Sequence, residues 1–412
     1  MNRIVLIGNG FDLAHGLKTS YKDFINWYWM DRGEKLLHSS NKTETDGLCS
    51  FKLKDNIGLA NWGLVWGHHY QRKDPLKPWD LNDVINIARE DKNLCDFWMS
   101  PFLQQICKSL ENKKWVDIEN EYYDMLTKSA LDGNSACSVD ELNKQLHLLQ
   151  DKLIEYLGII NQENTTINEK VKKRIYSPIK PCDISVEASN VVEEYVKGWG
   201  EKRRDEWEQK LDEYGISGTS GYNYIFDIED FQKGELRNQK YPNLFMLPDS
   251  IMLLSFNYTK TANAYLIKDR QSFVCNNIHG VIEKPSSVIF GYGDELDDKY
   301  KRLQNLNNNE CLLNVKTIKY QESDNYRRVL AFIESAPFQV FIMGHSCGNS
   351  DRTLLNTLFE HKNCISIKPF YYIKEDGTDN YLDLIQNISR NFTDMKLMRD
   401  RVVNKTYCET IT

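Results

Sequence analysis

The sequence IVLIGNGFDLAHGL, residues 4–17, has the pattern of a buried strand, a glycine turn and the start of a helix. Its apolar run, Ile4–Ile7, has the length and branched side chains of a central strand in a parallel sheet. Gly8 and Gly10 then allow a tight turn in which backbone amides can approach a pyrophosphate without a Cβ in the way. Leu13 stands at the third glycine of the dinucleotide-binding pattern G-x-G-x-x-G, so this turn alone predicts either a nucleotide site or an ordinary tight turn.

Apolar runs similar to Ile4–Ile7 recur after residue 250, and each is followed by glycine or polar residues. Helical patterns separate the later runs, at Tyr326–Ala336 and Thr353–Glu360. Strands that alternate with helices are typical of doubly wound α/β domains, and we therefore expect one Rossmann-like parallel sheet flanked by helices. The further strands expected are Ile251–Phe256, Val274–Ile278, Val288–Phe290, Val340–Met343 and Cys364–Ile367.

The middle of the chain has a helical pattern instead. Leucines recur every three or four residues from Leu142 to Leu157, which predicts an amphipathic helix with one face in a core. A second helix is expected at residues 191–214 with Asn190 as its N-cap, whereas the polar, turn-rich residues 38–56 predict a loop. We therefore expect a discontinuous Rossmann-like nucleotide-binding domain at residues 1–30 and 245–412, interrupted by a large, mainly α-helical insertion at residues 31–244.

Composition excludes several classes of protein. Of the 412 residues 41% are hydrophobic, so wholesale disorder is not expected. No apolar run reaches the ~20 residues that span a bilayer, and a signal peptide with a cleavage site is not expected. The net charge of -7 gives no general attraction to nucleic acid or anionic lipid. The scattered cysteines lack a C-x-x-C pair, which indicates reduced thiols in a cytoplasmic protein and predicts no metal site.

Polar residues follow two of the later strands directly. Ligands of open α/β sheets bind at the edge where the parallel strands end. Asn257, in the motif SFNYT, can there bond a ribose hydroxyl or hold a water, and its alternative role is an Asx turn. His279, in the motif NNIHG, can act as a general base near neutral pH, and its alternative is a core or capping histidine.

The turn after the strand Val340–Met343 carries a third polar motif, GHSCGNSD, which leads into a helix that we expect Asn349 or Ser350 to cap. Backbone amides at such a position bind phosphate or ribose oxygens. The spacing of Gly344, Ser346 and Gly348 also matches the G-x-S-x-G nucleophile turn of serine hydrolases. That alternative needs a histidine downstream, and only His361 follows, about ten residues beyond Asp351 on the expected helix, which is a poor spacing for a triad.

Taken in order, these motifs resemble those of the AbiH family of bacterial abortive-infection proteins. The opening GNGFDLAHGL is followed by SFNYT, IHG, FGYGDE and GHSCGNSDRTLLN. The segment Trp115–Glu119 resembles the helical region of the family, although an ordinary helix with an acidic face would have the same pattern. The resemblance covers both ends of the chain and implies antiviral defence, namely phage resistance by abortive infection.

The same order of motifs resembles the sirtuin fold more distantly. Gly8, Gly10 and Gly16 have the spacing of the sirtuin glycine loop. Three departures from sirtuins stand out: Thr259 replaces an aspartate, Asp12 replaces a serine, and the zinc cysteines are absent, so that a zinc-supported deacylase is not expected. The other matching motifs are Ser255–Thr259 with its central Asn257, His279–Gly280, Phe290–Gly291 and Gly344–Ser346.

The resemblance to sirtuin-like defence proteins implies that NAD+ is the substrate or ligand and that the nicotinamide–ribose bond is hydrolysed. The implied catalytic residues are His279 as the base, Asn257 as the holder of the nicotinamide ribose or of the water, and Asp12 as an orienting group. The implied cofactor-binding residues are Gly8, Asn9, Gly10 and Phe11 at the pyrophosphate, and Gly344, His345 and Ser346 at the adenosine ribose.

A non-catalytic interpretation stays open at this point. The same pocket can bind a nucleotide as a sensor or regulator within a defence system, with the helical insertion passing occupancy on to a partner. With either function we expect NAD or a related nucleotide as ligand, a phage-derived trigger or partner protein, and association with a second copy of the chain. Neither nucleic acid nor membrane is expected as a partner.

Overall fold

The computed structural model describes residues 1–54, 95–113, 116–133, 136–161, 166–202, 246–267, 270–374 and 376–412. The chain forms two compact units. Unit 1 comprises Met1–Gly16, Asn164–Val281 and Tyr320–Thr412, and unit 2 comprises Leu17–Glu163 and Ile282–Lys319. Both units are discontinuous in sequence. These units are defined by which residues pack together. The predicted bounds of the nucleotide-binding domain, near residues 30 and 245, therefore stay a prediction.

Unit 1 is built on a five-stranded parallel sheet with the strand order β6-β5-β1-β7-β8. Every residue of β1 and β7 is buried, as expected for strands covered on both faces, and this explains why most of their residues are apolar. The sheet confirms the predicted α/β, Rossmann-like fold class. Its strands are β1 (Asn2–Ile7), β5 (Ser250–Ser255), β6 (Phe273–Asn277), β7 (Phe338–Met343) and β8 (Cys364–Phe370).

The strand order creates a switch point beside β1. After β1 the chain adds β5 and β6 on one side, and it then crosses back to add β7 and β8 on the other side. The connections that leave β1 and β7 therefore run to opposite sides of the sheet, and the crevice at such a point is where ligands of open α/β sheets bind. The glycine turns at Gly8 and Gly344 follow these two strands directly.

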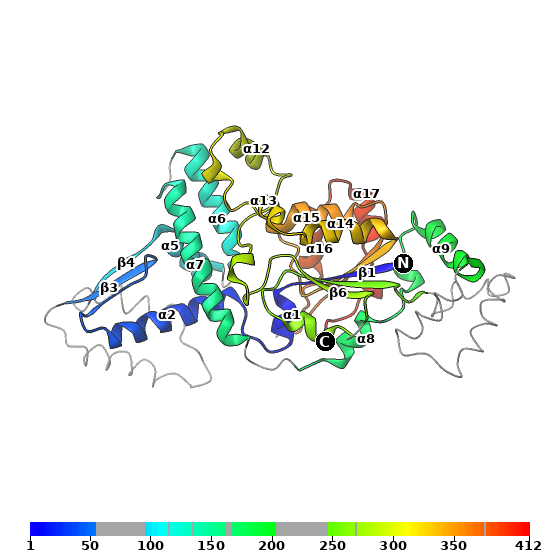
Figure 1. Ribbon diagram of the computed structural model, residues 1–412, viewed down its shortest axis with the longest axis horizontal. Coiled ribbons are helices and arrows are strands. Elements are labelled where there is room, and N and C mark those ends of the chain that lie inside the picture. The colour runs from blue at the N-terminus through cyan, green and yellow to red at the C-terminus, as the bar shows by residue number, and fades with distance from the viewer. Residues whose placement is uncertain are drawn as a thin grey trace. The chain divides into compact units, whose positions relative to one another are not determined.

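Helices cover both faces of this sheet. Figure 1 shows α14 and α15 on one side of it and α1 and α8 on the other. On the side of α1 and α8, Val5, Leu253 and Phe341 of the sheet pack with Phe11 and Val171 of the helices in one apolar core. The helices of unit 1 are α1 (Asn9–Ala14), α8 (Glu169–Ile175), α9 (Ser189–Lys202), α14 (Asn325–Ser335), α15 (Arg352–Phe359), α16 (Tyr381–Arg390) and α17 (Met395–Arg401).

Unit 2 is mainly helical and also holds a small antiparallel sheet with the order β2-β3-β4. The five leucines of α7 that were predicted to face a core are all buried, whereas Leu148 on another face is 36% exposed, and this confirms the amphipathic helix. The buried leucines are Leu142, Leu146, Leu149, Leu153 and Leu157. Its helices are α2 (Tyr21–His38), α5 (Pro101–Lys113), α6 (Ile118–Thr127), α7 (Val139–Ile160), α12 (Asp298–Asn305) and α13 (Lys316–Lys319), with a π-helical turn at Lys128–Asp132. Its strands are β2 (Thr43–Thr45), β3 (Cys49–Leu53) and β4 (Cys95–Met99).

Short 3-10 turns complete the described elements. They lie at Pro181–Asp183, Thr261–Tyr265, Pro285–Ser287, Asn309–Cys311, Tyr320–Glu322, Asn349–Asp351 and Lys405–Tyr407.

Three local predictions are wrong. Val288–Phe290 is not a strand of the sheet: it belongs to unit 2, where the chain that follows it bridges Tyr292 to Val315. The turn-rich residues 38–56 contain β2 and β3, because the turn at Gly47 joins them as a hairpin. The helix α9 begins at Ser189, so Asn190 lies inside it, and residues 203–214 of that prediction lie outside the described residues.

The composition also predicted reduced cysteines and no apolar run long enough to span a bilayer. All ten cysteines lie in the described residues, and none forms a disulfide. A membrane-spanning helix, one both long enough and apolar enough to cross a bilayer, does not occur in the part of the chain that the structure describes.

Candidate active site

The polar residues singled out in the sequence come from the ends of four neighbouring strands of unit 1. Asp12 lies on α1 after β1, and Asn257, His279 and His345 each stand two residues beyond the end of β5, β6 and β7. Because the strands are parallel, these positions share the carboxyl edge of the sheet. All four side chains are buried, which is unusual for polar residues and indicates specific partners.

The two glycine turns pack against each other at the switch point. The Gly10 N–H donates to the carbonyl oxygen of Gly344 at 2.8 Å, and the Phe11 N–H donates to that of Gly8 at 2.8 Å. Gly344 has a φ of 75°, and a Cβ there would lie 2.0 Å from the amide nitrogen of Phe11. Two of the amides expected to cradle a pyrophosphate are therefore bonded within the protein, while Asn9 is exposed at the same turn.

A buried carboxyl group lies beside this turn. Thr259 Oγ1 donates to Asp12 Oδ2 at 2.6 Å, and Asn257 Nδ2 donates to the carbonyl oxygen of Gly8 at 3.0 Å. Among the described residues Asp12 Oδ1 has no hydrogen-bond partner. Burial raises the pKa of Asp12, and hydrogen bonds from Thr259, Thr261 and Asn257 partly oppose that shift. The unsatisfied oxygen of Asp12 is the kind of group that can accept a hydrogen bond from a sugar hydroxyl.

Two histidines converge on one carboxylate that the sequence interpretation missed. His279 Nε2 lies 3.2 Å from Asp351 Oδ1, and His345 Nε2 lies 3.6 Å from Asp351 Oδ2. The ring of Phe256 packs against both imidazoles, at centroid distances of 5.2 Å from His279 and 4.0 Å from His345. His279 Nε2 is also 3.2 Å from the Tyr320 hydroxyl. The arrangement is a buried His–Asp–His cluster that can hold and move a proton.

The prediction that Asn349 or Ser350 caps the helix after GHSCGNSD is wrong. These residues form a 3-10 turn with Asp351, and α15 begins only at Arg352. Asp351 takes the N-cap position, but its side chain makes no cap hydrogen bond. Asp351 is the final residue of the motif GHSCGNSD, but from sequence alone an aspartate before a helix is expected to be an N-cap.

Ser346 and His361 do not form the couple that a serine hydrolase needs. Ser346 follows β7 at the carboxyl edge, whereas His361 precedes β8 and thus lies at the opposite, amino edge of the sheet. A six-residue strand separates these edges by ~20 Å. His361 is instead 3.1 Å from Glu334. This geometry opposes the nucleophile-turn interpretation.

Two further motifs meet inside unit 2. Glu119, in the segment at Trp115–Glu119, accepts a hydrogen bond from the Gly291 N–H at 3.2 Å and forms a 2.7 Å ion pair with Lys316. Tyr123 stacks on Tyr292 with ring centroids 3.7 Å apart. Trp115 itself lies outside the described residues. The FGYGDE motif is therefore anchored to α6 rather than to the parallel sheet.

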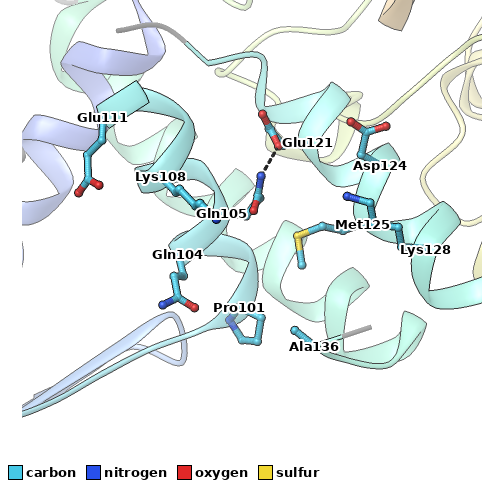
Figure 2. A pocket seen from close by; sticks show the side chains of 10 residues that line it. All are labelled: Pro101, Gln104, Gln105, Lys108, Glu111, Glu121, Asp124, Met125, Lys128 and Ala136. Carbon is cyan, nitrogen blue, oxygen red and sulfur yellow. Dashed lines mark hydrogen bonds between the residues drawn. The ribbon is translucent and has the colours of Figure 1, made fainter. Parts of the chain in front are cut away.

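A hollow of about 530 Å³ lies in unit 2 between α5 and α6, and Figure 2 shows Gln105 donating to Glu121 within its lining. None of the residues predicted as catalytic or cofactor-binding lines it. Metal-ligand clusters of three or more His, Cys, Asp or Glu are likewise not found among the residues that the structure describes. The lining residues are Pro101, Gln104, Gln105, Lys108, Glu111, Glu121, Asp124, Met125, Lys128 and Ala136.

Comparison with known proteins gives one finding. Searches of the curated proteins and of the solved structures returned no significant match. The family described as "Bacteriophage abortive infection AbiH" matches residues 4–372, which include both glycine turns, Asn257, His279 and Asp351. The match spans nearly the whole chain and confirms the resemblance seen in the motifs. The chain belongs to the AbiH family, whose role is defence against bacteriophage by abortive infection.

Proposed function

We propose that this chain is a cytoplasmic NAD+ hydrolase that cleaves the nicotinamide–ribose bond during abortive infection. The observation that carries the proposal is the gathering of Asp12, Asn257 and His279, all buried, at the carboxyl edge of one parallel sheet. The switch point beside β1 is the position at which such sheets bind nucleotides. Removal of NAD+ would halt the metabolism on which a phage depends, which fits the family's role in defence.

The reaction needs few groups. The bond between C1′ of ribose and the pyridinium nitrogen breaks, nicotinamide leaves with the electron pair, and a water oxygen bonds to C1′ of the oxocarbenium-like centre. His279 takes the proton of that water and passes it to solvent, which gives ADP-ribose, nicotinamide and one proton. Because Asn257 Nδ2 donates to Gly8, its Oδ1 is the atom offered to the water or the ribose.

The other residues would bind the dinucleotide. Asp12 Oδ1 would accept a hydrogen bond from a ribose hydroxyl. Asn9, with the backbone of Gly8–Phe11, would contact the pyrophosphate, and Gly344–Ser346 the adenosine ribose. Since the Gly10 and Phe11 amides are bonded internally, the pyrophosphate contact would use the exposed side of the turn at Asn9.

A second candidate is a nucleotide-binding sensor or regulator without turnover. It is favoured by Thr259, which stands where the sirtuin motif has a carboxylate and whose hydroxyl donates to Asp12. A phage-derived trigger, a partner protein or a second copy of the chain would act on either function, since an unrestrained hydrolase would harm its host.

Binding and turnover measured on the same samples separate the two candidates. We expect wild-type protein to bind NAD+ in calorimetry and to release nicotinamide, and His279→Ala and Asn257→Ala to lose turnover by about 100-fold or more. His361→Ala, at the opposite edge of the sheet, is the matched control and should keep both properties. Binding without turnover, even in extract of phage-infected cells, would favour the sensor. Absence of binding there would refute both.

A further inference from the structure

We propose that Asp351 is the positioning residue of this site and that its two carboxylate oxygens hold His279 and His345 as one electrostatic unit. The effect on catalysis rests on the proposed function, whereas the electrostatic unit itself does not. Three observations support the proposal. The Asp351 side chain makes no helix-cap hydrogen bond, the tautomer of His345 is set by a backbone contact, and the turn that carries His345 and Asp351 is held by hydrogen bonds from two asparagines.

Asp351 stands at a helix N-cap without acting as one. Aspartate at this position normally accepts hydrogen bonds from amides of the first helical turn, as Asp394 does before α17 at 2.7 and 3.3 Å. Asp351 makes no such cap bond, and its two carboxylate oxygens face one imidazole each. Its side chain is 9% exposed, so the carboxylate is held away from water by the groups that it binds.

The tautomer of His345 follows from a backbone contact. The Cys347 N–H lies 3.0 Å from His345 Nδ1, so this nitrogen accepts a hydrogen bond. A neutral imidazole that accepts at Nδ1 carries its proton at Nε2, which is the nitrogen that faces Asp351. The Nε2–H of His345 thus faces one oxygen of Asp351 at 3.6 Å, an electrostatic contact that favours the orientation in which the other oxygen lies 3.2 Å from His279.

Two asparagines, Asn387 in α16 and Asn391 directly after its end, hold the turn in the conformation that this contact needs. Cys347 has a φ of 54°, which is uncommon for a residue with a side chain and indicates local strain. Asn391 Nδ2 donates to the Cys347 carbonyl at 2.9 Å, and Asn387 Nδ2 donates to the Ser346 carbonyl at 2.9 Å. The strained residue is therefore fixed on its carbonyl side by Asn391 and on its amide side by His345.

The groups that face His279 make Asp351 its anionic partner. The Tyr320 hydroxyl also lies 3.2 Å from His279 Nε2, and His345 contacts the second oxygen of Asp351. Burial, with the nearby Asp351 charge, raises the pKa of the Cys347 thiol, so this thiol stays protonated and uncharged. A carboxylate beside an imidazole orients the ring and stabilises the imidazolium that forms when the base takes a proton.

The kinetic test compares Asp351→Asn with Asp394→Asn. Asparagine keeps the shape of the side chain and removes its charge. We expect Asp351→Asn to lower kcat by about 100-fold or more with little change in KM, and to move the acid limb of the pH profile down by about one pH unit. Asp394→Asn keeps a helix cap and should leave both unchanged. If Asp351→Asn had the kcat of wild type and an unchanged acid limb of the pH profile, the proposed effect of Asp351 on catalysis would be wrong.

A second test needs neither turnover nor a variant. Nitrogen NMR of histidine-labelled wild-type protein reports the tautomer of each ring, and we expect the Nε2–H form for both His279 and His345 at neutral pH. An Nδ1–H form of His345 would overturn the unit even if NAD+ is hydrolysed. Finding both rings as expected in a protein without NAD+ turnover would keep the unit and reject only the proposed function.

Discussion

Gly344 is the residue on which the closest packing at the sheet edge depends. Its Cβ would fall 2.0 Å from the Phe11 nitrogen, and its φ of 75° disfavours any side chain. We expect Gly344→Ala to lower the free energy of unfolding by about 3 kcal/mol or more. Gly377→Ala, with a φ of 81° and open space around it, should lower it by only about 1–2 kcal/mol. Urea unfolding of both variants measures the difference, and equal losses would contradict the close packing.

Asp12 should reveal a conflict between stability and function. Its raised pKa means that the folded protein binds this proton at a higher pH than the unfolded chain does. The free energy of unfolding therefore falls as pH rises from the ordinary aspartate value through the raised value. Asp12→Asn removes this effect, so it should unfold at higher urea than wild type at pH 7 and should lose the advantage towards pH 4.

The same Asp12→Asn variant should release less nicotinamide, because an amide replaces the carboxyl group that is proposed to accept a hydrogen bond from a ribose hydroxyl. Urea midpoints at several pH values and a nicotinamide assay on the same preparations check both halves. A variant less stable than wild type at pH 7 would show that the hydrogen bond from Thr259 outweighs the cost of burying the charge.

The ion pair of Glu119 and Lys316 should be strongly coupled. Lys316 is 1% exposed, so Lys316→Met would leave the Glu119 charge buried and unpaired and should lower the free energy of unfolding by about 3–5 kcal/mol. Adding Glu119→Leu should recover much of that loss. The double-mutant cycle is measured by urea unfolding. Additive losses would mean that Lys316 matters for its packing alone.

At this scale the sequence predicts residue type better than residue partners. Asn257 and His279 could be named because each follows an apolar run that ends in a turn, and the structure places both at one edge of the sheet. Asp351 could not be distinguished from a helix cap, because the difference lies in where its carboxylate points. The Gly10 amide bonds to Gly344, more than 300 residues away, and this contact has no local signal in the sequence.

Among the elements, α7 gives the clearest test of a core face. Leu149 is fully buried on the apolar face of this helix, whereas Ile159 near its end is 52% exposed. We expect Leu149→Ala to lower the free energy of unfolding by about 2–5 kcal/mol and Ile159→Ala by less than about 1 kcal/mol. Thermal and urea unfolding check this, and similar losses would contradict the assignment of the faces.

Element predictions succeeded where one periodicity extended over several turns or a whole strand. The leucine spacing of α7 and the apolar runs of β1, β5, β6, β7 and β8 leave little choice, since each element buries a face or both faces. Val288–Phe290 shows the limit. Its side chains are largely buried like those of a strand, but Gly291 packs against the backbone of Asn314 and no strand of the sheet pairs with it. A segment must be buried and must also pair with a neighbouring strand to be part of a sheet, and an apolar sequence indicates mainly its burial.

For the whole molecule, order along the chain carried more information than any single motif. The motifs of residues 4–16, 255–259, 276–280 and 344–351 all belong to unit 1, although 237 residues separate residue 17 from residue 255 in the sequence. A parallel sheet brings such segments to one edge because each strand ends there. The family match over residues 4–372 agrees with that order.

The proposed hydrolase is tested most directly by nicotinamide release from NAD+ by purified wild-type protein, beside His279→Ala and the control His361→Ala. We predict release by wild type and the control and about 100-fold less release by His279→Ala. If the purified wild-type protein releases no nicotinamide, the assay is repeated in extract of phage-infected cells, which would supply a phage-derived trigger. Equal release by all three proteins would contradict the role of His279, and persistence of NAD+ in the infected extract would contradict the hydrolase itself.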